Sequence, residues 1–210
     1  MDDQIIISIN REHGSLGHEV AVRLADSLGY DLYDRDILTQ LAEDSNMSPD
    51  ALHAFKKYDE KRRRPFVSRS VNGYTNSLED IITEKVHDYE RKLAESGKNF
   101  VLVGRCGNEV LIDEPGLISV YIYADEDKKV KHIMKSRNKD EKEARREIKS
   151  VDKHRRDYYE HYTGKEWKDF RNYDLVLNSS KLGLDGTVEI IKNFVALKKY
   201  HMNGEFPDQD

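Results

Sequence analysis

The 210-residue sequence has a single cysteine, Cys106. One thiol excludes a disulfide within the chain and a metal site built on several cysteines. The sequence also lacks any apolar run near the roughly 18 residues that a membrane-spanning helix needs. Its first residues, Met-Asp-Asp-Gln, have none of the basic and apolar character of a secretory signal. We therefore expect a soluble, cytoplasmic protein with no membrane partner.

Hydrophobic residues are scarce too, at 37% of the chain against 36% charged residues. The net charge of −5 comes from 35 basic and 40 acidic side chains, and this balance argues against binding of nucleic acid over a broad basic surface. Local basic clusters can still hold small anions. The length fits one domain, residues 1–210, because compact domains cluster near roughly 100–200 residues.

Short apolar runs alternate with amphipathic segments along the chain. Buried strands are predicted at residues 5–9, 30–34, 99–104, 117–124 and 173–179. Helices are predicted at residues 15–28, 35–44, 78–96, 125–137, 140–162 and 185–200. This alternation predicts an α/β fold with a parallel sheet covered by helices on both faces. Ligands of such sheets bind beyond the carboxyl ends of the strands, so those positions hold the candidate site residues.

The first candidate site follows the first predicted strand. Gly14 and Gly17 stand just before a helix, where backbone N–H groups and the helix dipole can hold phosphate oxygens. Ser15 between them is suited to cap that helix. The Lys-Ser or Lys-Thr pair of a phosphate-binding loop is absent, and an ordinary strand-to-helix turn explains the residues equally well. Arg11 and His18 are the candidates for the missing positive charge.

Two further strand ends carry polar residues. Asp34 follows the second predicted strand and could orient a Mg²⁺-bound water or a substrate hydroxyl, although it could equally cap the next helix. Arg105 follows a buried strand and a glycine, a position suited to bidentate binding of phosphate. The alternative for Arg105 is a structural ion pair at the sheet edge.

A strongly charged stretch lies between the fourth and fifth predicted strands. Asp152, Arg155 and Arg156 fall at helical spacing and share a face, and Arg137 precedes them. Phosphoryl-transfer sites need several positive charges around the transferred group, often on a flap that excludes water. Taken alone, a solvated helix is the stronger interpretation, but the position of the stretch favours a functional one. The histidines are scattered without ligand spacing, so we expect no metal site built by the protein.

Taken together, these segments resemble the cytidylate kinase-like family, a branch of the P-loop nucleoside monophosphate kinases. The matching residues are 7–38, 100–111, 118–133 and 151–183 together with the closing helix. The resemblance covers nearly the whole chain except residues 45–75. It implies a five-stranded parallel sheet of order 2-3-1-4-5, a nucleoside-monophosphate-binding insertion at about residues 45–96, and an arginine-bearing lid at about residues 137–172.

The resemblance also implies an activity: transfer of the γ-phosphoryl group of ATP to a nucleoside monophosphate, with CMP or dCMP as the first candidate acceptor. Mg²⁺ would enter with ATP, and Ser15 is the one side chain we consider for contact with it. Gly14, Ser15 and Gly17 would belong to the ATP loop, and Arg105 would hold the acceptor phosphate. Arg137, Asp152 and Arg155 would belong to the lid, and we add Arg156 to the catalytic candidates.

Three residues depart from the pattern of authentic cytidylate kinases. Gly17 takes the place of the loop lysine, Leu16 that of a loop glycine, and Cys106 that of the aspartate in the acceptor motif. The branch generally reads Gly-Ser-Gly-Gly in the loop, so it shares the loss of lysine but not Leu16. Two alternatives therefore stay open: a catalytically silent nucleotide-binding module, and a kinase of another small phosphate acceptor. Assembly into a homo-oligomer also stays open.

Overall fold

The computed structural model describes residues 4–34, 78–104 and 106–204. Five parallel strands form one sheet of order β2-β3-β1-β4-β5, which confirms the predicted fold class and strand order. The strands are β1 (Ile6–Arg11), β2 (Asp31–Tyr33), β3 (Phe100–Leu102), β4 (Leu117–Tyr123) and β5 (Leu175–Asn178). The predicted helix at residues 35–44 and residues 45–77 of the predicted insertion lie outside the described residues.

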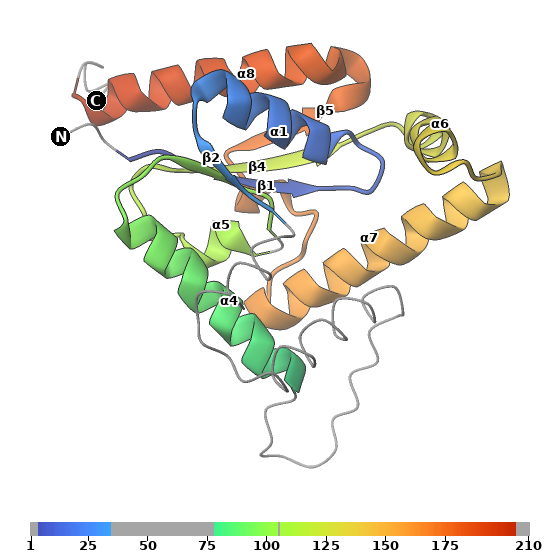
Figure 1. The fold of residues 1–210 in the computed structure, drawn as a ribbon, viewed down its shortest axis with the longest axis horizontal. Coiled ribbons are helices and arrows are strands. Elements are labelled where there is room, and N and C mark those ends of the chain that lie inside the picture. Colours follow the sequence, from blue (N-terminus) through green and yellow to red (C-terminus); the bar gives the residue numbers. More distant parts are fainter. Residues whose placement is uncertain (1–3, 35–77, 105, 205–210) are drawn as a thin grey trace.

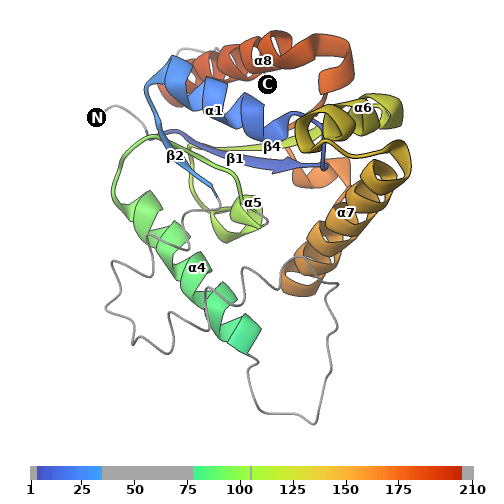
Figure 2. The same ribbon diagram turned by 45° about the vertical axis from the view of Figure 1, so that its right-hand side comes forward.

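Helices cover both faces of the sheet. They are α1 (Gly17–Leu28), α4 (Leu78–Glu95), α5 (Gly107–Val110), α6 (Glu126–Arg137), α7 (Glu141–Thr163) and α8 (Ser179–Met202). Figure 1 shows α1 and α8 side by side on one face, with α4 and α5 on the other. The helices α6 and α7 lie beyond the carboxyl ends of the strands, and α7 runs from there towards α4 (Figures 1 and 2). None of the helices described is long and apolar enough to cross a bilayer.

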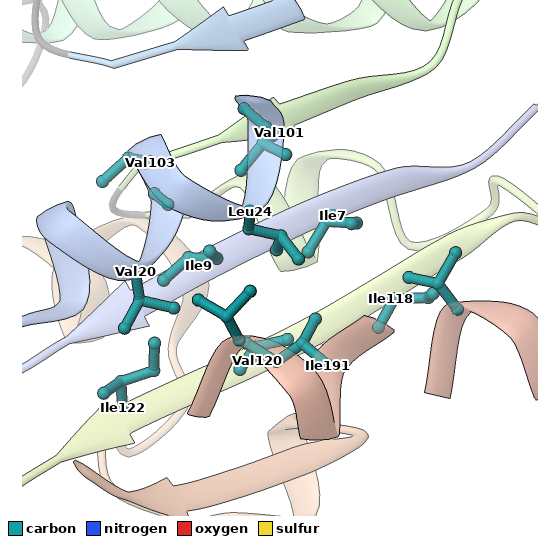
Figure 3. Close-up of a cluster of buried hydrophobic side chains, with 14 of the residues drawn as sticks. Ile7, Ile9, Val20, Leu24, Val101, Val103, Ile118, Val120, Ile122 and Ile191 are labelled. Carbon is teal, nitrogen blue, oxygen red and sulfur yellow. The ribbon is translucent and has the colours of Figure 1, made fainter. Parts of the chain in front are cut away.

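The central strand β1 is buried on both sides, which explains its unbroken apolar sequence. Ile7 and Ile9 point towards α1 and α8, where they pack with Val20 and Leu24 of α1 and with Ile191 of α8 (Figure 3). Burying one such side chain stabilises the fold by about 1.5–3 kcal/mol. This core holds the first turn of α1 directly beyond the carboxyl end of β1.

The long helix α7 is held by aromatic residues at its carboxyl end. Trp167 and Tyr159 are completely or almost completely buried, and the Trp167 ring meets Tyr121 of β4 edge to face, with ring centroids 5.5 Å apart. At its other end α7 begins with a capping box between Asp140 and Glu143. With both ends fixed, the charged middle of α7 lies against the loop that follows β1.

Candidate functional site

The residues that follow β1, β2 and β3 meet at one cleft of about 1170 Å³, as the position of ligand sites in parallel sheets predicts. Its remaining walls come from α4, α6 and α7. Of the candidate residues, those lining the cleft are Arg11, Gly14, Gly17, His18, Asp34, Arg137 and Arg155. Arg105 lies outside the described residues.

The loop after β1 has a tight backbone. Gly14 has φ +82, and a Cβ there would lie 3.0 Å from the Lys129 carbonyl oxygen, so the position suits glycine alone. Contrary to our expectation for Ser15, the cap residue of α1 is Leu16, which makes no side-chain cap hydrogen bond. The Ser15 hydroxyl instead donates to the Glu12 carbonyl oxygen at 2.9 Å, inside the loop.

Arg11 occupies the space that a loop lysine needs. The P-loop pattern is Gly, any four residues, then Gly-Lys and Ser or Thr. With Gly17 at the lysine, Arg11 and Leu16 replace the two glycines and His18 replaces the Ser or Thr. A Cβ on Gly17 would lie 2.5 Å from the Arg11 Cβ and 2.7 Å from its Cγ. Arg11 and a side chain at position 17 are therefore mutually exclusive.

The Arg11 side chain crosses from the β1 loop to the end of β3. Its Nη1 donates to the Gly104 carbonyl oxygen at 3.0 Å, and its side chain lines the cleft. The guanidinium thus lies at the end of β3 and brings a positive charge to the cleft that the β1 loop also lines. Arg11 is a candidate for this charge from its sequence position alone, and the space that its Cβ and Cγ occupy beside Gly17 adds a geometric reason.

Helix α7 holds the loop at three points. Arg155 Nη1 donates to the Arg11 carbonyl oxygen at 2.7 Å, and the His13 backbone N–H donates to Asp152 Oδ1 at 2.7 Å. The His13 ring lies with Nε2 2.9 Å from Glu147 Oε1. Burial lowers the pKa of His13 to about 4, so the ring is neutral at pH 7 and donates from Nε2 to the Glu147 carboxylate. Asp152 and Arg155 therefore act on the loop backbone.

A buried group of charges lies behind the loop. Glu12 is 6% exposed and lies between Lys129, at 2.9 Å, and Lys168. Burial alone would raise the pKa of Glu12, but the hydrogen bonds from Lys168 and Lys129 outweigh it and lower the pKa, so Glu12 is ionised. The pKa of Asp152 shifts the other way. Its Oδ2 lies 3.9 Å from Lys129 Nζ, but burial has the larger effect and raises the pKa of Asp152 to about 6.

Four of these contributors are not among the site residues predicted from the sequence: Glu12, Glu147, Lys129 and Lys168. Glu12 stands inside the glycine loop and could have been suspected from that place. The other three lie in segments so rich in charge that no local signal separates them from solvated neighbours.

The other predicted residues lie in different surroundings. His18 and Asp34 lie at the mouth of the cleft, with Nδ1 of His18 3.4 Å from Oδ2 of Asp34. Arg137 is half exposed, its Nε 3.8 Å from Glu147 Oε1. Arg156 is exposed outside the cleft lining, with Nη2 3.8 Å from Asp157 Oδ1. The fold thus brings Arg137 and Arg155 to the cleft and turns Arg156 away from it.

The residues present fit a phosphate group better than a protein-bound metal ion. Glycine backbone at the start of α1 and nearby arginines provide the donors that phosphate oxygens need. Within the described part of the chain, no group of three or more His, Cys, Asp or Glu side chains could hold a metal ion. The Ser15 hydroxyl already donates to the loop backbone, although its oxygen can still accept.

Leu16 adopts a left-handed backbone conformation, with φ 63 and ψ 11. This conformation costs a non-glycine residue roughly 1–2 kcal/mol. Replacement by glycine removes that cost, but the greater freedom of glycine in the unfolded chain offsets part of the gain. We expect Leu16→Gly to raise the free energy of unfolding by about 0.5–1 kcal/mol, measured by urea denaturation. Asn138→Gly is the matched control, since Asn138 also has a positive φ of 49 but asparagine tolerates it. Equal effects of the two variants would contradict strain at Leu16.

Glu90 on α4 is a buried carboxyl group in the wall of the cleft. It is 3% exposed, and its Oε2 has no hydrogen-bond partner among the residues described. Burial raises the pKa of Glu90 to about 8 against a small opposing effect of Arg91, so the group is mostly protonated at pH 7. In the sequence, Glu90 resembles any other charged residue of an amphipathic helix, so it is not among the predicted site residues.

The raised pKa of Glu90 predicts a pH-dependent stability. The folded state holds this proton up to about pH 8, whereas the unfolded chain loses it near 4.5, so the stabilisation from Glu90 falls as pH rises between these values. Glu90→Gln does not titrate. We compare the free energy of unfolding of Glu90→Gln with that of the wild type. Between pH 5 and pH 8 we expect the difference, variant minus wild type, to rise by about 2–4 kcal/mol. Urea denaturation at both pH values measures this; a constant difference would contradict it.

A model of the cytidylate kinase-like family matches residues 6–181 of this chain. Among curated proteins, the chain is 26% identical over 194 residues to a cytidylate kinase of Archaeoglobus fulgidus, covering 92% of this chain and 96% of that protein. A cytidylate kinase of Natronomonas pharaonis is also 26% identical, over 207 residues, covering 98% and 93% of the two chains.

Among solved structures, an uncharacterised protein of Eubacterium ventriosum matches with a TM-score of 0.72 and 31% identity, covering 92% of this chain and 99% of that one. A gluconokinase of Sinorhizobium meliloti matches with a TM-score of 0.55 and 13% identity, covering 98% and 99% of the two chains. At that identity the second match supports the fold alone, and it agrees with the strand order described above.

Proposed function

Since this chain belongs to the cytidylate kinase-like family, we propose that it transfers the γ-phosphoryl group of ATP to a nucleoside monophosphate, with CMP and dCMP as the first candidate acceptors. One observation carries the proposal: the glycine loop after β1 and arginines from three elements face one cleft. Arg11 comes from the β1 end, Arg137 from α6 and Arg155 from α7. A convergence of cations at a helix N-terminus suits the binding and transfer of a phosphoryl group.

In this proposal the β1 loop binds the ATP phosphates. The backbone of Gly14 to Gly17 and the first turn of α1 supply N–H donors, and Arg11 supplies the positive charge. Asp152 positions the loop by accepting the His13 backbone N–H, so it acts through the loop and not on the substrate. Mg²⁺ bound with the nucleotide would neutralise charge between the β- and γ-phosphates, and Ser15 remains the one side chain proposed to contact it.

The transfer itself demands little covalent chemistry, so positioning and charge neutralisation account for most of the rate. We propose that Arg155 and Arg137, which line the cleft, stabilise the γ-phosphoryl group as it leaves ADP, and Arg156 stays a weaker candidate because of its exposed position. For the acceptor we propose Arg105 as the ligand of its phosphate, while Asp34 at the cleft mouth orients a hydroxyl or water. Residues of α7, in the region where a lid is expected, line the described cleft.

The loop also supports a second candidate, a nucleotide-binding module without catalysis. Arg11, Leu16, Gly17 and His18 differ from the P-loop pattern, and the Ser15 hydroxyl donates to the loop itself. Such a loop can keep its backbone N–H groups for phosphate binding after losing the side chains that accelerate transfer. A kinase of a different small phosphate acceptor is the remaining alternative.

Release of ADP from Mg²⁺-ATP tests these alternatives directly. The purified protein is assayed with CMP, dCMP, UMP, AMP and GMP, while ATP binding is titrated in parallel by calorimetry. ADP release that requires one of these acceptors supports the kinase and identifies its substrate. ATP binding without acceptor-dependent release favours the silent module or another acceptor. Absence of ATP binding contradicts the proposed role of the β1 loop.

A further inference from the structure

We propose that Glu90 is a specificity-determining residue on the acceptor side of the cleft, where its carboxyl group hydrogen-bonds the uncharged polar edge of the acceptor's base. This inference rests on the proposed function and deepens it, since it assigns a residue to recognition of the acceptor and not of its phosphate. Three features support it: the position of α4, the polarity of its cleft face, and Glu90 Oε2, which has no hydrogen-bond partner within the described part of the chain.

Helix α4 forms one wall of the cleft, on the side opposite the ATP loop. It lies on the opposite side of the sheet from α1, whose N-terminus carries the glycine loop (Figure 1). Val86, His87 and Glu90 of α4 line the cleft together, and their spacing places them on one helical face. A molecule whose phosphate lies near the arginines would therefore direct its other end towards this wall.

This wall is polar but uncharged at neutral pH. Burial lowers the pKa of His87 to about 4 and raises that of Glu90 to about 8, so both side chains are mostly neutral at pH 7. A phosphate needs cations or several N–H donors. Among the described arginines that line the cleft, those of α6 and α7 lie on other walls, and Arg11 Nη1 donates to the Gly104 carbonyl oxygen. A protonated carboxyl group offers one O–H donor beside one C=O acceptor. The edge of a nucleobase presents the complementary pair of an acceptor beside a donor.

The Glu90 carboxyl group occupies a confined place below the end of β3. Its Oε1 would lie 3.4 Å from a Cβ on Gly104, so the glycine leaves the carboxyl group just enough room. Its Oε2 is buried with no hydrogen-bond partner among the described residues. Native proteins leave few buried polar atoms unpaired, because each one lowers stability. A bound acceptor that completes this hydrogen bonding explains why an acid stands where a leucine would pack better.

The test compares Glu90→Leu and Glu90→Met with Glu90→Gln, which keeps a donor and an acceptor of similar shape. Glu84→Leu, an exposed glutamate of the same helix, is the matched control. Each protein is titrated by calorimetry with CMP, dCMP, UMP, AMP and GMP and with ATP, and its melting temperature is recorded. Where turnover exists, KM and kcat are measured as well. The methionine variant serves if the leucine variant does not fold.

We expect Glu90→Leu and Glu90→Met to weaken acceptor binding by about tenfold or more, with ATP binding within about twofold of wild type. Glu90→Gln should bind the acceptor within about threefold of wild type, and both apolar variants should melt at a higher temperature. Wild-type acceptor affinity in the apolar variants would overturn the inference and reduce Glu90 to a core residue.

The binding readout separates this inference from the proposed function. A wild-type protein that binds one of the five nucleotides without releasing ADP contradicts the transfer reaction. The Glu90 variants then still test whether Glu90 recognises that nucleotide. A wild-type protein that transfers phosphate normally while the apolar variants bind equally well contradicts only the role of Glu90. If none of the five nucleotides binds, the inference is overturned as well.

Discussion

Replacing Arg155 by alanine is expected to lower kcat about a thousandfold while changing the free energy of unfolding by only about 1 kcal/mol. Arginines that stabilise the charge of a transferring phosphoryl group contribute on the order of a thousandfold or more. The stability cost is expected to be small because Arg155 is partly exposed, and a hydrogen bond such as that from its Nη1 to the Arg11 carbonyl oxygen contributes only about 1 kcal/mol. Steady-state kinetics and urea denaturation measure the two effects separately.

Two further variants of α7 calibrate this result. Arg145→Ala removes an exposed arginine that pairs with Glu141 at the start of α7, outside the cleft lining, and should leave kcat within about twofold. Arg156→Ala should have an effect between those of the other two variants, because its side chain is exposed beside the site. Two results would show that Arg155 only positions the loop. One is a wild-type kcat for Arg155→Ala, and the other is a loss of activity no larger than its loss of ATP affinity.

Restoring the missing lysine by Gly17→Lys is expected to abolish ATP binding and lower the free energy of unfolding by about 2 kcal/mol. The new Cβ would lie 2.5 Å from the Arg11 Cβ, a separation that requires the backbone of β1 or α1 to shift. Gly17→Ala carries the same Cβ and should lose comparable stability, which separates the clash from the added charge. Thermal denaturation and ATP titration measure both variants.

The double variant Arg11→Gly with Gly17→Lys tests the cause. Removing the Arg11 side chain clears the space beside position 17 and restores a further residue of the P-loop pattern. We expect the double variant to recover most of the stability lost by Gly17→Lys, and ATP binding with it. A stable and more active Gly17→Lys single variant would show that Arg11 does not replace the lysine.

The fold was predictable because its signals are local. Each strand of the parallel sheet is a short apolar run, and each crossover helix repeats its apolar residues with the helical period, as Val20 and Leu24 do in α1. Strand order came from the family resemblance, since periodicity does not encode which strands are neighbours. Boundaries were less accurate: β1 extends to Arg11, and α8 begins at Ser179 with a break at Gly183, well before the predicted start at residue 185.

By itself, the sequence determined the chemistry available at the carboxyl edge of the sheet: a glycine loop without its lysine, and arginines in the stretch between β4 and β5. Only the tertiary structure decided how these residues meet. His13 contacts Asp152 from 139 positions away, and Lys129 reaches Glu12 across 117 positions. Such pairs depend on the path of the whole chain, and burial, which gives Glu90 its high pKa, is likewise a property of the assembled fold. Local patterns describe which groups are present, whereas packing decides which of them share one cleft.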